Sequence, residues 1–415
     1  MHEKITMPNG VRILSEKMEG VRSAAIGIWV GVGSRFEDAE EAGSAHFIEH
    51  MLFKGTSKYT AAQLAEQMDA VGGQINAYTT RDCTCFYARV LDSHLPMTID
   101  LLSDMFFDSN FDEADVKNET GIIEEEIGMY EDTPDDVVVE QLMANCFPGP
   151  LGRPVLGRPD TLETFTGERL RAFKDKNYIA PRIVVSLAGS FTPADIRQIE
   201  GRFAVLPAAE NPLPVPCAYT PGLITRRQHA EQNQLVLAFP GLPFGSGERF
   251  AVGLMSGILG GNASSRLFQN IREKHGLCYS VFSFSASFLE TGMFAIAAGT
   301  GRDTEKRAIE LILDELRRLC DAGVTEEELN RSREQIKASM LMDMESTAAR
   351  MNRIGNGELY RGGVLSPEEV VAIYDAITRD DILRIARNVF NIRQMSVSAL
   401  GNVWDEDYYR GLMQG

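Results

Sequence analysis

The sequence predicts an α+β protein with two tandem homologous domains, each an antiparallel-rich sheet covered by helices. Segments of the first half recur in the second half at an offset of roughly 210 residues, which is the size of a domain. In each half, strand-like stretches alternate with amphipathic helical stretches. Residues 207–222 are too rich in proline for a helix or a central strand. We therefore expect an N-terminal domain at 1–206, a linker at 207–222 and a C-terminal domain at 223–415.

Pairs of similar segments support the duplication. Two strand patterns in the first half have counterparts in the second, and in each half the later strand follows a helical pattern. Each half also has a helix whose first turn is acidic. The pairs are 24–30 with 234–239, 111–116 with 324–329, 167–176 with 380–389, and 184–190 with 397–402.

Local signals define further elements. Asn9 and Gly10 separate two short apolar stretches, a pattern that predicts a β-hairpin. A helix is expected over 60–71, capped by Thr60 and stopped by a glycine pair. A second helix is expected over 303–320, where apolar residues form a stripe at helical spacing.

Charge and composition exclude some classes of function. The 415-residue chain carries a net charge of −18, which argues against nucleic acid as a partner. The acidity serves solubility, and an acidic chamber would also attract basic peptides. No apolar stretch approaches the roughly 18 residues of a transmembrane helix, and the N-terminus lacks the apolar core of a signal peptide. We expect a cytoplasmic protein without membrane insertion.

The motif H-x-x-E-H is the strongest chemical signal in the chain. On a helix, His46 and His50 lie one turn apart on one face, where two neutral imidazoles can bind zinc. Glu49 lies beside the same face and can accept a proton from a water molecule at the metal. The flanking residues are mostly apolar, so the segment is expected to be buried, and buried histidines need partners.

The motif lies within residues 43–56, a run that resembles the pitrilysin-like (M16) zinc metallopeptidases, in particular the bacterial processing-peptidase-like subfamily. The resemblance extends over the whole chain. It implies the mitochondrial processing peptidase-like (LuxS-like) metallohydrolase fold, one zinc ion per chain, and two homologous domains that enclose a chamber.

A zinc site of this kind needs a third protein ligand. On residues alone, Glu124, Glu125 and Glu126 are each able to supply it from the helix that follows Asp112. The family pattern has two glutamates seven residues apart, the second followed by an aliphatic residue. On that resemblance, Glu126 is the ligand and Glu119 is a carboxylate that orients a ligand histidine.

Resemblance to the family also implies residues that bind substrate. Arg272 and Tyr279 match the family's R-x6-Y signature and are expected to stabilise the oxyanion. The edge strand with Asn76, Ala77, Tyr78 and Thr79 is expected to pair with the peptide main chain. The alternative for these residues is a structural role in an ordinary strand, ion pair or core.

The second half provides an internal control. At the position of H-x-x-E-H it is expected to have residues 260–272, which contain no histidine, and the position facing Glu126 falls near Ser339. A motif present in only one copy points to chemistry rather than to architecture.

The predicted function is a zinc-dependent endopeptidase that hydrolyses unfolded peptides, with Glu49 as general base. The chain has half the length of single-chain pitrilysins, so we expect a homodimer. A heterodimer with an inactive paralogue is the other arrangement considered. The rival functions are a catalytically silent scaffold subunit and a hydrolase of non-peptide amides.

Overall fold

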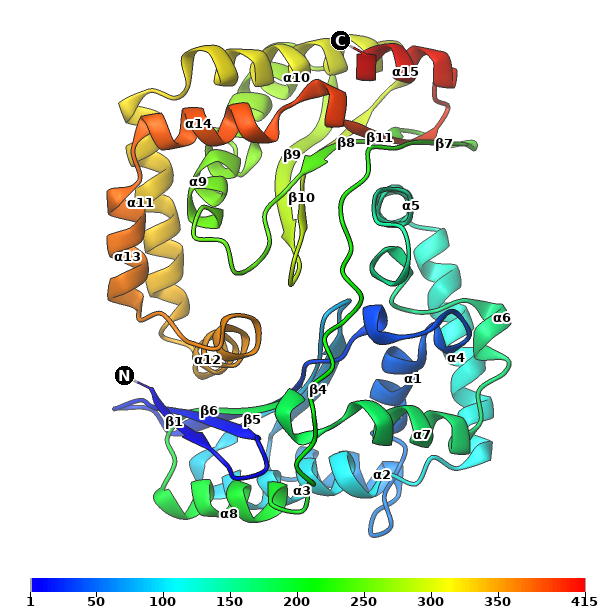
Figure 1. Cartoon of the computed structure of the whole chain (residues 1–415), viewed down its shortest axis with the longest axis vertical. Coiled ribbons are helices and arrows are strands. Elements are labelled where there is room, and N and C mark those ends of the chain that lie inside the picture. Colours follow the sequence, from blue (N-terminus) through cyan, green and yellow to red (C-terminus); the bar gives the residue numbers. More distant parts are fainter. Residues whose placement is uncertain (1, 415) are drawn as a thin grey trace. The chain divides into compact units, whose positions relative to one another are not determined.

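The computed structural model describes residues 2–414 and divides into two compact units (Figure 1). The first unit comprises Met1–Ile127, Arg153–Val215 and Leu341–Ser366, and the second comprises Gly128–Gly152, Pro216–Met340 and Pro367–Gly415. Among the helices of residues 2–414, none combines the length and apolar character that crossing a bilayer requires.

The first unit contains a six-stranded sheet in the order β1-β2-β6-β3-β5-β4. All neighbouring strands are antiparallel except β2 and β6. Its elements are β1 (Glu3–Thr6), β2 (Arg12–Lys17), β3 (Ser23–Val30), α1 (Ser44–Met51), α2 (Ala61–Asp69), β4 (Gln74–Thr79), β5 (Thr84–Leu91), α3 (Leu95–Asp108), α4 (Glu113–Glu131), α6 (Pro159–Leu162), α7 (Gly167–Asn177), β6 (Ile183–Gly189), α8 (Pro193–Phe203) and α12 (Thr347–Arg361).

The second unit repeats this plan with a five-stranded sheet in the order β7-β11-β8-β10-β9. One pair, β7 with β11, is parallel and the others are antiparallel. Its elements are α5 (Pro134–Cys146), β7 (Leu223–Arg227), β8 (Asn233–Pro240), α9 (Arg249–Gly260), the π-helical segment Phe268–Lys274, β9 (Cys278–Ser287), β10 (Gly292–Thr300), α10 (Arg302–Ala322), α11 (Glu326–Asp343), α13 (Pro367–Ala376), α14 (Arg379–Val389), β11 (Ser396–Gly401) and α15 (Glu406–Gln414).

The predicted α+β class and the duplication are therefore confirmed. The hairpin forms between β1 and β2, and Thr60 caps α2 by accepting the backbone N–H of Gln63. The expected helix over 303–320 corresponds to α10, and residues 207–222 form neither a helix nor a strand.

Each sheet is covered by a helix from the other half of the chain. In the first unit, α12 packs against β3 and β6, while α3 and α8 lie on the opposite face (Figure 1). In the second unit, α5 packs against β8 and β11. The compact units therefore differ from the contiguous halves 1–206 and 223–415, because the apolar stripes of α5 and α12 find their partner sheets across the sequence boundary.

α12 packs closely against the first sheet, and ion pairs join the two at both ends of the helix. A Cβ on Gly27 of β3 would lie 2.5 Å from the sulfur of Met351, so a larger residue there would force the methionine side chain to move. At one end Glu16 pairs with Arg350 (Nη1–Oε1 2.6 Å), and at the other Glu358 pairs with Lys4 (Nζ–Oε1 2.7 Å). Both glutamates are buried, and each buried charge has a cationic partner.

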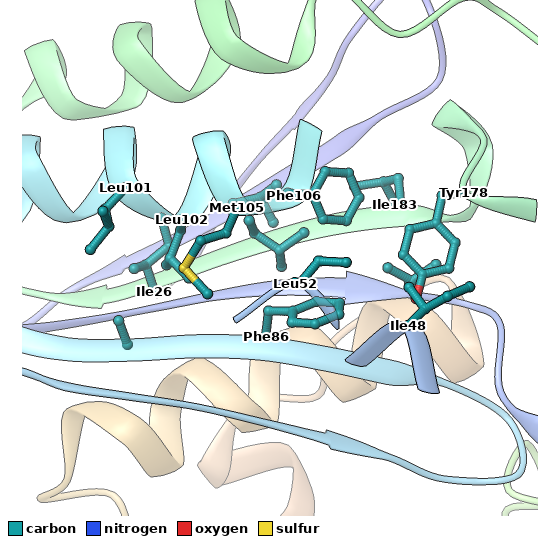
Figure 2. Close-up of a cluster of buried hydrophobic side chains, with 14 of the residues drawn as sticks. Ile26, Ile48, Leu52, Phe86, Leu101, Leu102, Met105, Phe106, Tyr178 and Ile183 are labelled. Atoms are coloured by element: carbon teal, nitrogen blue, oxygen red, sulfur yellow. The ribbon is translucent and has the colours of Figure 1, made fainter. Parts of the chain in front are cut away.

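The core between the sheet and α3 also holds the helix with the histidine motif. Figure 2 shows Leu102, Met105 and Phe106 of α3 facing side chains of the strands, with Ile48 and Leu52 among them. Since Ile48 and Leu52 are fully buried, one side of α1 is fixed in the core.

Candidate metal centre

The short helix α1 presents two histidines on one face. His46 and His50 have ring centroids 4.6 Å apart, as expected for positions one turn apart on a helix. Ala45, Phe47 and Ile48 are fully buried and anchor the other side of α1. The apolar residues therefore fix the helix, and the imidazoles are left on the side that faces α4.

Glu126 of α4 completes a group of three possible metal ligands. Its Oε2 lies 3.8 Å from Nε2 of His46 and 3.7 Å from Nε2 of His50. The ligand atoms all lie within 4.8 Å of one another, and the described residues contain no second group of this kind. Of the three consecutive glutamates, the structure thus brings Glu126 to the histidines, while Glu125 is exposed.

Glu119 orients one of the two imidazoles. Its Oε2 lies 3.0 Å from Nδ1 of His50, and its Oε1 lies 2.5 Å from Nζ of Lys54. Burial alone would raise the pKa of Glu119, but the hydrogen bonds to His50 and Lys54 hold it below its usual value. An ionised Glu119 keeps the proton of His50 on Nδ1, which leaves Nε2 free to bind a metal.

His46 is held in its neutral form. Burial, with a smaller effect of nearby His50, lowers the pKa of His46 to about 3. Its Nδ1 is buried and has no hydrogen-bond partner among the described residues. A neutral imidazole is the form that binds a metal.

Glu49 stays outside this ligand group and has its own partner. The hydroxyl of Thr79 donates to Oε2 of Glu49 at 2.6 Å. Burial raises the pKa of Glu49, and the hydrogen bond from Thr79 opposes that rise. A carboxylate with a raised pKa beside a possible metal site suits a general base.

The strand β4 ends the first sheet, so it is an edge strand as the sequence analysis expects. Asn76 is exposed, and Ala77 and Tyr78 are half-buried. Tyr78 packs edge-on against Trp29, with ring centroids 6.1 Å apart. Thr79 differs from the other three because its side chain contacts Glu49, a contact that was not predicted from the sequence.

Arg272 and Tyr279 belong to the second unit. Arg272 lies in the π-helical segment, and its guanidinium carbon lies 5.4 Å from the centroid of the Tyr279 ring. The tyrosine side chain is 71% exposed. The structure therefore brings these two predicted residues together on an accessible surface of their own unit.

One predicted correspondence between the halves is wrong. In the element order, the helix that follows β8 is α9, so the counterpart of α1 is Arg249–Gly260 rather than residues 260–272. Those residues continue into the π-helical segment that precedes β9. Gly260 is the last residue of α9 and Gly261 is its C-cap, so residues 260–272 begin where the helix ends. α9 contains no histidine.

The donor set fits zinc. Two imidazole nitrogens and one carboxylate oxygen form the three-ligand set of catalytic zinc sites, which leaves a position for water. The carboxylate behind His50 is the outer contact that ligand histidines usually have. The fold and this site together define a two-domain α+β protein with a candidate zinc centre.

Comparison with known proteins identifies the family. Residues 12–159 match the model of Insulinase (Peptidase family M16), and residues 164–336 match that of the Peptidase M16 inactive domain. The chain belongs to peptidase family M16.

Relatives of similar length include two proteins named as uncharacterized zinc proteases. YmxG of Bacillus subtilis (strain 168) is 41% identical over 393 residues, covering 94% of this chain and 96% of the relative. SCO5738 of Streptomyces coelicolor is 39% identical over 418 residues, covering 98% of this chain and 91% of the relative. The crystal structure of a protease from Helicobacter pylori shares the fold, with a TM-score of 0.89 at 20% identity over 97% of this chain and 99% of that chain.

Proposed function

We propose that this protein is a zinc-dependent endopeptidase in which His46, His50 and Glu126 hold the metal and Glu49 is the general base. The observation that carries the proposal is the separation of roles among four side chains. Three possible ligands converge within 4.8 Å, while Glu49 on the same helix is excluded from the group and bonded to Thr79. A purely structural metal site has four protein ligands and needs no adjacent base.

The chemistry divides between the metal and the protein. A zinc ion held there would lower the pKa of a water molecule and polarise the carbonyl of the peptide to be cleaved. Glu49 accepts a proton as the water oxygen bonds to the carbonyl carbon. The same carboxyl then returns the proton to the amide nitrogen as the C–N bond breaks. One water molecule is consumed, and a carboxylate and an amine are released.

The substrate is proposed to be an extended peptide. An edge strand offers main-chain N–H and C=O groups, and pairing with β4 would bind a peptide with little dependence on its side chains. Asn76, Ala77 and Tyr78 supply that strand beside Thr79. Arg272 and Tyr279 are proposed to donate hydrogen bonds to the oxyanion, and the working form is proposed to be a homodimer.

The proposal is tested by cleavage of a quenched fluorescent peptide library by the wild type and Glu49→Gln, with zinc measured on both. We expect about one zinc per chain in each protein and cleavage by the wild type only. Glu126→Gln should lose zinc, whereas the matched Glu125→Gln, altered at an exposed neighbouring acid, should keep both zinc and activity. Equal activity of Glu49→Gln and the wild type would refute the assignment of the base.

A second candidate function is a catalytically silent scaffold subunit. The "inactive domain" that matches residues 164–336 is the observation that raises it. Full zinc content without cleavage of any peptide would favour this alternative.

A further inference from the structure

Glu37 is a buried acid that contacts the first turn of α1. Its side chain is 1% exposed. Oε2 accepts the backbone N–H of Gly43 at 2.8 Å, and Oε1 accepts the backbone N–H of Ala45 at 2.8 Å. Both oxygens of one carboxylate are therefore used at the start of the helix that carries His46, Glu49 and His50.

This helix has no cap of its own. The residue at its N-cap, Gly43, has no side chain to accept the free N–H groups of the first turn. With eight residues, α1 is too short to be stable without external contacts. Glu37 supplies acceptor oxygens for two of the N–H groups at this end of the helix.

Other contacts fix the same end of α1 to the segment around residues 153–161. Gly43 has φ of 97°, and a Cβ there would lie 2.9 Å from Cα of Gly157. The hydroxyl of Thr161 donates to the carbonyl of Ala42 at 2.7 Å. These contacts hold the chain before the helix, whereas Glu37 accepts one N–H group from the N-cap residue Gly43 and one from Ala45 in the first turn.

Burying a carboxylate is costly, so the arrangement needs a compensating gain. Burial raises the pKa of Glu37 to about 8, and the N–H groups of Ala45 and Gly43 act against that rise. An amide or an apolar residue would avoid the cost of a buried charge. Neither would offer two acceptor oxygens to the two N–H groups at once.

We propose that Glu37 is a positioning residue of the metal centre, fixing the first turn of α1 so that His46 and His50 meet Glu126. The inference rests on the proposed function, since it assumes that these three residues bind zinc. Ala45 directly precedes His46, so loss of the Glu37 contact displaces the first ligand before the rest of the helix.

The test measures zinc affinity by competition with a chromogenic chelator for the wild type, Glu37→Gln, Glu40→Gln and His46→Ala. Glu40 is the matched control, an exposed acid on the same segment. We expect Glu37→Gln to raise the Kd for zinc about ten-fold, in the range found when a residue behind a metal ligand is changed. Glu40→Gln should bind zinc as the wild type does.

Thermal unfolding separates positioning from general stability. We expect Glu37→Gln to reduce the difference in Tm between the zinc-loaded and zinc-free forms. A metal that binds the folded protein more weakly raises its stability by a smaller amount. If Glu37→Gln lowers both Tm values equally and leaves the Kd unchanged, the inference is overturned. If Glu37→Gln does not fold, Glu37→Asp serves the same comparison, since it keeps the carboxyl group but is too short to reach both N–H groups.

His46→Ala distinguishes failure of the inference from failure of the proposed function. Retention of wild-type zinc affinity by His46→Ala would overturn the metal centre itself. Loss of zinc by His46→Ala, together with wild-type affinity in Glu37→Gln, would overturn the role of Glu37 alone.

Discussion

Apart from the additional edge strand β1, the two sheets have the same strand order and the same single parallel pair. Among the described residues, however, a possible metal centre lies in the first unit and not in the second. In each unit a helix follows the strand at the same place in the order: α1 after β3, and α9 after β8. α9 is apolar along most of its length, with Leu254, Met255 and Leu259 fully buried. α1 keeps the apolar side and adds His46 and His50 on another. The apolar side is therefore common to both helices, whereas the histidines occur on α1 and not on α9.

The largest effect is expected from His50→Ala. Zinc binding should be lost, and peptide cleavage should fall by more than the roughly 10⁴-fold upper range of general acid–base catalysis, since metal and base are disabled together. Zinc content and cleavage rates check this. If the variant instead fails to fold, His50 is needed for the stability of the fold. That result would contradict the conclusion drawn from comparing α1 with α9.

Leu254→Ala in α9 is the complementary change. It should lower the free energy of unfolding by about 2–5 kcal/mol, the usual cost of emptying a buried leucine site. Urea unfolding measures this loss, and zinc content at low temperature should equal that of the wild type. A loss of zinc without a loss of stability would contradict a purely structural role for α9.

Glu119→Gln sharpens the comparison within the metal centre. The amide cannot pair with both His50 and Lys54 as the carboxylate does, so His50 loses its fixed orientation. Zinc affinity should fall roughly 10–100-fold. Chelator competition measures the effect, and an unchanged Kd would show that Glu119 does not act through His50.

The smallest effect is expected from Thr79→Val. The substitution removes the hydrogen bond that opposes the rise in the pKa of Glu49, so this pKa should increase further. The base acts in its ionised form and is lost as the pH falls through its pKa. The acid limb of kcat/KM should therefore move to higher pH, with little change on the plateau above it.

Thr80→Val is the matched control for that profile, because the hydroxyl of Thr80 donates to the carbonyl of Cys83 and not to Glu49. An acid limb that stays in place in Thr79→Val, or moves equally in both variants, would contradict the role of Thr79.

Much of the fold and part of the site follow from local sequence patterns. The periodicity around His46 and His50 is visible within one helical turn, and alternation predicts the strands without knowledge of their neighbours. The third ligand, Glu126, could not be predicted from local patterns, because three adjacent glutamates offer the same carboxylate. Only the family pattern selected among them before the structure brought Glu126 beside the histidines.

The remaining features depend on contacts between distant segments. Glu37 precedes α1 without any motif spacing, and its burial becomes visible only when the chain folds back on it. Glu119 pairs with both His50 and Lys54. The sequence gives only a weak indication of this role for Lys54, namely its position four residues after His50. The apolar stripe of α12 shows that the helix must pack against another element. It does not show which of the two sheets that element belongs to.

The exchange of α5 and α12 has a consequence for how the protein is made. When a ribosome has synthesised the first 206 residues, the chain still lacks α12, and the face of the first sheet that holds Trp29 has no cover. The first unit is complete only after residue 366 has emerged, by which point most of the second unit has also been made. The two halves must therefore mature together, and a gene cut at the linker would encode two fragments that each need the other to hide an apolar surface.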